Sequence, residues 1–221
     1  MTRSLQRSCG DLRSVGRNNL EIVMSFVQMI RFRDNIPVDA MEYRNSWGGA
    51  AAIWDVLYNK YLKDPTKYWD SWLLTVSKGD NRLWELWSSD NPAITRCERL
   101  TLLMTFDHAY VTKDNFSSMA SDLREFVKLH DLDKKVGVQH LSQWANDLEK
   151  CDADAIGFWM TSTVDNPWSR WNQETQESEP VILGSSDKHF NIHEVYDEYV
   201  ASKTEFEESE EATASAADAP E

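Results

Sequence analysis

The residues after Asp114 carry the clearest amphipathic pattern of this chain. Apolar side chains recur there every three or four positions, at Phe116, Met119, Ala120, Leu123, Phe126 and Val127. Side chains with this spacing lie on one face of an α-helix, because the helix makes one turn in about 3.6 residues. Such a face has to be buried against another element, so the segment predicts a helix that covers a hydrophobic core.

Six further segments predict helices around the same core. They are residues 47–63 and the segments that begin near Thr66, Asp80, Asp90, Gly137 and Ile192. In Asp90-Asn91-Pro92, for example, Pro92 is suited to the first helical turn, where its missing N–H costs no hydrogen bond. We therefore expect a mainly α protein, with a single helical domain of about seven helices over residues 24–203.

Two short segments favour strands instead. Residues 25–33 alternate between two sets of side chains, as a strand does, although a helix is also compatible with them. Residues 155–163 form an apolar run with Gly157 and two threonines, a composition that suits a strand better than a helix. We expect at most two short strands.

The two ends of the chain differ in charge from each other. Residues 1–23 are rich in Arg and Ser and lack the apolar region of a secretory signal, so we expect a basic leader that is disordered or not translated. A mitochondrial transit peptide is one alternative, and a translation start at Met24 is another. Residues 204–221 carry acidic residues, no base and a single aromatic, and predict a disordered acidic tail.

The formal net charge of -14 constrains the partners. A protein that binds nucleic-acid phosphates presents Lys and Arg, so we expect no direct nucleic-acid binding. No apolar stretch reaches the roughly 18 residues of a membrane helix, and an anionic membrane surface would repel this chain. Three scattered cysteines form no disulfide framework, which favours a cytoplasmic location. The expected partner is another protein with a basic surface.

Ten tryptophans make the chain tryptophan-rich, and several are spaced three residues apart. The pairs Trp69/Trp72 and Trp84/Trp87 lie on predicted helices, where this spacing puts both rings on one face. We interpret them as core residues; an aromatic platform for sugars or bases is the alternative.

A third pair, Trp168/Trp171, lies in the polar segment 164–180 and differs from the others. Large aromatics in such a loop either pack onto the core or contact a partner. Tryptophan is the residue most enriched at binding hot spots, and acidic neighbours would attract a basic partner. The candidate partner-binding residues are Asp152, Asp154, Asp165, Trp168, Arg170 and Trp171.

Catalytic and metal-binding patterns are weak. Asp107-His108 and the pair Asp152/Asp154 are the candidate acid–base groups, but adjacent residues do not face each other. His189 and His193 stand four apart without the third ligand of a zinc site, and we interpret them as solvated histidines at a helix start. We therefore assign no catalytic residue, no metal and no cofactor.

The resulting functional hypothesis is a non-catalytic acidic protein that binds another macromolecule. One specific form of it is an inhibitor of the phage type whose carboxylates mimic nucleic-acid phosphates. A hydrolase-type enzyme with Asp/His chemistry and an assembly subunit are the alternatives.

The acidic tail leads to the first testable expectation. Truncation after Lys203 should leave the melting temperature nearly unchanged, because a polar tail contributes no core contacts. Thermal unfolding followed by circular dichroism measures this. A marked loss of stability would show that Phe206 contributes to the fold.

Overall fold

The computed structural model describes residues 26–44, 49–66, 78–134, 140–160 and 166–217, and it is built on a mixed five-stranded sheet. The sheet contains β1 (Phe26–Arg33), β2 (Ile36–Arg44), β3 (Ala109–Thr112), β4 (Ala155–Trp159) and β7 (Phe190–Asn191). The strand order is β2-β1-β4-β3-β7, with β3 and β7 parallel and the other neighbours antiparallel. A separate hairpin pairs β5 (Ser169–Asn172) with β6 (Glu177–Pro180).

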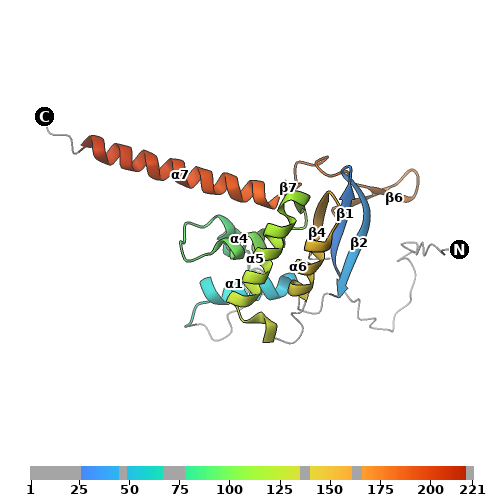
Figure 1. The fold of residues 1–221 in the computed structure, drawn as a ribbon, viewed down its shortest axis with the longest axis horizontal. Coiled ribbons are helices and arrows are strands. Elements are labelled where there is room, and N and C mark those ends of the chain that lie inside the picture. Colours follow the sequence, from blue (N-terminus) through green and yellow to red (C-terminus); the bar gives the residue numbers. More distant parts are fainter. Residues whose placement is uncertain (1–25, 45–48, 67–77, 135–139, 161–165, 218–221) are drawn as a thin grey trace.

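The helices gather on one side of the sheet (Figure 1). They are α1 (Ala50–Tyr61), α3 (Arg82–Glu85), α4 (Arg96–Leu103), α5 (Phe116–Leu129), α6 (His140–Lys150) and α7 (Ile192–Ala217), with 3-10 turns at Leu86–Ser88, Lys113–Asn115 and Leu132–Lys134. Helix α7 begins beside β7 and extends away from the other helices (Figure 1). Within the described ranges, no helix combines the length and the apolar character needed to cross a membrane.

Each face of the sheet contributes side chains to a hydrophobic core, because successive side chains of a strand point to opposite sides. On the inner face, Val27 and Met29 of β1 and Ile156 and Phe158 of β4 belong to one hydrophobic core with the helices. The apolar face predicted after Asp114 supplies the α5 part of this core, from Phe116 to Val127. The inner core therefore holds the helical layer to the sheet.

The outer face has a second, smaller core around Trp168. Its ring meets Phe32 edge-on at 5.1 Å, and its indole N–H donates to the carbonyl of Phe158 at 3.0 Å. Gly157 lies beneath the ring, and a Cβ at this position would stand 2.7 Å from Trp168. Glycine is thus required because the indole packs directly on the strand backbone.

The sequence predicts a mainly α, or all-α, protein with at most two short strands. This prediction is wrong, because the structure contains a five-stranded sheet and a two-stranded sheet. The strand expected at residues 25–33 is confirmed as β1, and that at 155–163 corresponds to β4. The missed strands lack a clear apolar signal: β2 lies at a sheet edge and contains Pro37, and β3 has only four residues. The hairpin strands are mostly polar because Trp168, just before them, makes most of their core contact.

Several of the predicted helices are confirmed. Helices α1, α5 and α6 and the start of α7 lie where the spacing predicts them. Helix α4 begins after Thr95 rather than at Asp90, whereas the helix expected from Thr66 lies mostly outside the described residues. Helix α7 also continues through residues 204–217, for which disorder is predicted. Glu and Ala dominate that segment, and both are strong helix formers.

The packing of Trp168 on Gly157 generates a stability test. Gly157→Ala should lower the free energy of unfolding by about 1–3 kcal/mol, because the added methyl overpacks the site. The same change in a Trp168→Phe background should cost less, since the smaller ring leaves room for the methyl. Urea unfolding of the four proteins measures the coupling; equal costs in both backgrounds would contradict the contact.

Candidate binding groove

A groove of about 420 Å³ runs between the β5–β6 hairpin and strand β2 on the outer face of the sheet. Its floor contains Gln28 and Ile30 of β1, which pair with Glu42 and Ala40 of β2. Its lining is Gln28, Ile30, Pro37, Val38, Asp39, Ala40, Asn166, Trp168, Ser169, Ser178 and Pro180. Figure 1 shows the hairpin near the ends of β1 and β2. The groove thus lies where the hairpin leaves the outer face uncovered.

Backbone hydrogen bonds fix the hairpin to the sheet. The N–H of Val181 donates to the carbonyl of Trp168 at 3.1 Å, which closes the hairpin above its buried indole. The N–H of Leu183 donates to the carbonyl of Asn35 at 2.8 Å, in the turn between β1 and β2. Asp34 and Asn35 both have positive φ there, as two-residue hairpin turns require. The wall of the groove is therefore closed at its base and attached there to the β1–β2 turn.

The structure separates the two tryptophans of the predicted contact site. Trp168 is 2% exposed and packs onto the outer core, and it also lines the groove. Trp171 is 56% exposed on β5, and neighbouring Arg170 lies 3.4 Å from Glu179 across the hairpin. Trp168 and Trp171 are three residues apart, so in extended chain their side chains point to opposite sides.

The predicted acidic residues Asp152 and Asp154 lie at the turn between β1 and β2. Asp152 pairs with Arg33 at 2.6 Å, and this hydrogen bond lowers the pKa of the carboxyl below its ordinary value. Asp154 accepts the N–H of Asp34 at 2.9 Å and so stabilises the β1–β2 turn. Asp165 lies outside the described residues. Both described aspartates therefore support the turn to which the hairpin is attached.

Four exposed apolar side chains lie on β2 and in the hairpin region that border the groove, and one of them, Val38, lines it. Ile36 and Val38 on β2 are 48% and 51% exposed, and Ile182, next to the anchored Leu183, is 51% exposed. Together with Trp171, they make up half of the eight exposed large hydrophobic residues in the described ranges. Apolar side chains grouped at one place on a surface are typical of contact sites.

The rim of the groove is acidic. Strand β2 and the hairpin segment 169–180 carry the five acidic residues Asp39, Glu42, Glu174, Glu177 and Glu179, against Arg44 and Arg170. Hydrogen bonds from Asn172 and then Arg170 lower the pKa of Glu179, which keeps its carboxylate charged. The border of the groove therefore carries a net negative charge, although Asp39, its one acidic lining residue, is paired with Arg31.

The candidate acid–base residues are engaged elsewhere. A carboxylate oxygen of Asp107 accepts the backbone N–H of Met160 at 2.8 Å. The ring of His108 lies 6.1 Å from that of His189, and burial is the main cause that lowers the pKa of both imidazoles. The groove is lined by neither Asp107 nor His108, and Asp152 and Asp154 do not line it either. None of these four candidate acid–base residues therefore lines the groove.

The two histidines at the start of α7 differ in their surroundings. His189 accepts the N–H of Gly184 at 3.1 Å and lies 4.7 Å from the ring of Trp168. His193 is only 4% exposed, so its interpretation as a solvated residue is wrong. Among the described residues, no group of three His, Cys, Asp or Glu side chains is arranged to hold a metal ion.

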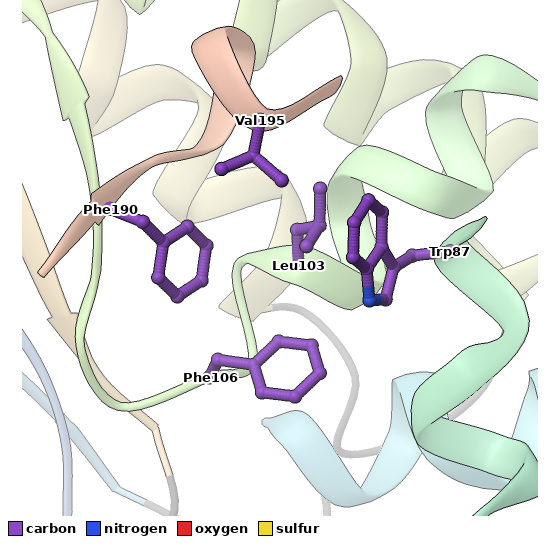
Figure 2. Close-up of a pocket in the computed structure, with 5 residues that line it drawn as sticks. All are labelled: Trp87, Leu103, Phe106, Phe190 and Val195. Carbon is purple, nitrogen blue, oxygen red and sulfur yellow. The ribbon is translucent and has the colours of Figure 1, made fainter. Parts of the chain in front are cut away.

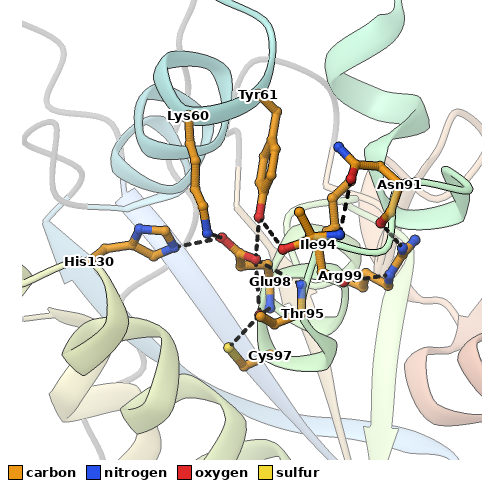
Figure 3. Close-up of polar contacts among 10 residues, drawn as sticks. Lys60, Tyr61, Asn91, Ile94, Thr95, Cys97, Glu98, Arg99 and His130 are labelled. Carbon is orange, nitrogen blue, oxygen red and sulfur yellow. Dashed lines mark hydrogen bonds and ion pairs between the residues drawn. The ribbon is translucent and has the colours of Figure 1, made fainter.

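A buried polar cluster joins three helices around Glu98 (Figure 3). The carboxylate of this fully buried residue accepts Lys60 Nζ at 2.8 Å and Tyr61 Oη at 2.7 Å from α1. His130 Nε2, at the end of α5, lies 2.9 Å from the same carboxylate. Burial alone would raise the pKa of Glu98, but these partners and the N–H of Thr95 lower it well below the ordinary range. The cluster therefore holds a permanent carboxylate that crosslinks α1, α4 and α5.

A sequence signal for this cluster was missed. Thr95 and Glu98 form a capping box, in which each side chain bonds the backbone N–H of the other. The spacing Thr-x-x-Glu identifies the true start of α4, whereas Asp90-Asn91-Pro92 directed the prediction five residues too early. The partners Lys60 and His130 are distant in sequence, so no local pattern predicts them.

Comparison of the chain with protein families, with curated proteins and with solved structures finds no match.

Glu98 gives a test of pH-dependent stability. Its pKa is lower in the folded than in the unfolded protein, so its stabilising contribution is complete above the ordinary carboxyl pKa of about 4.3 and declines as the pH falls below it. Glu98→Gln should cost on the order of 3 kcal/mol at pH 7 and flatten the decline of stability in acid. Urea unfolding between pH 2 and about 7 tests both.

A matched control is Glu149→Gln, which removes an exposed carboxylate that bonds Arg124 at 2.5 Å. Solvent screens that pair, so the control should change stability little. If the two substitutions have equal effects, Glu98 is not the crosslink described above.

Proposed function

We propose that this protein is a non-catalytic binding protein that takes an extended, basic segment of another protein along strand β2. The observation that carries the proposal is the position of β2 at the sheet edge beside the groove. In the described sheet, β2 pairs with β1 on one side only, so the outer side of its backbone is available to a further strand. Addition of a strand to an exposed edge is a recurrent mode of peptide recognition.

The length and position of β2 support this mode. It spans nine residues, Ile36–Arg44, and Pro37 lies near its beginning, where one missing N–H leaves the rest of the edge usable. The other edge strand, β7, has only two residues. Alternate side chains of an added strand would reach the outer face, where Val38 is exposed in the groove, and Trp171 is exposed on the hairpin strand β5.

Charge supports a basic segment in particular. The acidic rim and the net charge of the whole chain attract Lys and Arg, and such attraction accelerates association and sets specificity more than affinity. The inhibitor that mimics nucleic acid, inferred from sequence, is one form of this function. The free cysteines Cys97 and Cys151 agree with the reducing cytoplasm that we propose as its location.

The other two functional classes have less support. For an enzyme, the described groove lacks the convergent titratable side chains that acid–base chemistry requires. For an assembly subunit, β2 would pair with β2 of a second copy, and the acidic rims would then face each other. The repulsion between them favours a basic partner instead.

A designed peptide tests the proposal directly. An acetylated eight-residue peptide of alternating Val and Lys should bind, with shifts in the backbone amide NMR signals of residues 38–44. Two matched peptides serve as controls: one with Glu in place of Lys, and one N-methylated at every second residue. Both should bind much more weakly, because the first loses charge attraction and the second loses edge hydrogen bonds.

Variants of the protein locate the site. The double substitution Val38→Ala and Trp171→Ala should weaken peptide binding by about 2 kcal/mol, or roughly 30-fold, without changing the melting temperature. Leu129→Ala, at an exposed residue of α5, is the control and should leave binding unchanged. Equal binding of the N-methylated peptide would refute strand addition. A stable dimer in sedimentation would favour the assembly subunit.

A further inference from the structure

A second pocket lies at the start of helix α7, apart from the groove (Figure 2). It has a volume of about 240 Å³ and is lined by Trp87, Leu103, Phe106, Phe190 and Val195. These residues come from five places in the chain: the first 3-10 turn, α4, the loop after α4, β7 and α7. Their side chains surround a common space in Figure 2.

The walls of this pocket are held in place from behind. Arg99 is 6% exposed and donates to the carbonyl of Trp87 at 2.7 Å, which fixes the backbone of that wall. The Trp87 ring packs edge-on against Tyr199 of α7 at 6.1 Å. Phe106 packs in the same way against Phe190 at 6.2 Å. A pocket with walls fixed in this way requires little ordering on binding, which favours a ligand.

The lining determines the chemistry of the occupant. The only polar side-chain atom among the five lining residues is the indole Nε1 of Trp87, and none of the five carries a charge. A quaternary ammonium ion can bind between aromatic rings, but here no carboxylate lines the pocket to offset its desolvation. A neutral ring has no such cost and can pack edge-to-face against Phe106, Phe190 and Trp87.

The size of the pocket fits one such ring. A dry apolar cavity of about 150 Å³ in another protein is large enough to bind benzene. The pocket found here has a volume of about 240 Å³ and is open to solvent on one side, so a bicyclic ring of the size of indole can enter it.

We propose that the pocket at the start of α7 is a binding site for a single uncharged aromatic group, either a free molecule or an aromatic side chain of a partner. This site is independent of the β2 groove and does not depend on the function proposed for it. Without a polar anchor, a free ring should bind with a dissociation constant on the order of 1 mM.

Methyl NMR of the full-length protein tests the site with defined probes. Indole should cause saturable shifts of the Leu103 and Val195 methyl signals and leave Val200 unchanged. N-Acetyltryptophanamide distinguishes the two sources: the same shifts show that the mouth admits a ring attached to a peptide, whereas binding of indole alone indicates a small-molecule site. Either result supports the proposal. It would be overturned if indole failed to shift these signals, or if tetramethylammonium shifted them as strongly.

Two substitutions in α7 form a matched pair. Val195→Trp fills the pocket and should weaken indole binding at least 10-fold, read at the Leu103 methyls. Val200→Trp adds the same bulk at a position that is 42% exposed, and should retain binding. Equal affinity in both variants would refute the site. If Val195→Trp fails to fold, the titration of the wild-type protein with indole still tests the site, because the Leu103 and Val195 methyl signals report binding without any variant.

Discussion

Strand β4 lies in the middle of the sheet, and its side chains must be covered on both faces. The helices cover the inner face, where Ile156 and Phe158 join the main core. The outer face depends on Trp168, which packs on the bare backbone of Gly157. One indole covers only part of a sheet face. The arrangement of the outer side follows from this limit, since the hairpin attached to Trp168 stops short of β2 and leaves the groove.

Two buried charged residues, adjacent in the sequence, connect the helices to one another. Glu98 gathers partners from α1 and α5, whereas Arg99 donates to the carbonyls of Leu86, Trp87, Asn91 and Ile94. A buried charge is tolerated when its hydrogen bonds are satisfied, and both residues meet this condition within the described structure. Because they are adjacent on α4, this one helix fixes both the helical layer and the walls of the aromatic pocket.

The groove and the pocket differ in the interactions that they offer. The groove combines a free strand edge with exposed apolar residues and an acidic rim, a combination that suits an extended cationic chain. The pocket offers apolar contact to a neutral ring, with the Trp87 indole N–H as its only polar side-chain group. An acidic protein with both features can recognise charge at one place and shape at another.

The sequence by itself determined the elements whose side chains repeat with a clear period, such as α5, and the acidic character of the chain. It also singled out the segment 164–180, in which Trp171 is exposed on β5. Only the tertiary structure decided that Trp168 is buried, that β2 is an edge strand and that Glu98 meets His130. Local periodicity reports which face of an element is apolar, but the partner of that face comes from residues far away in the chain.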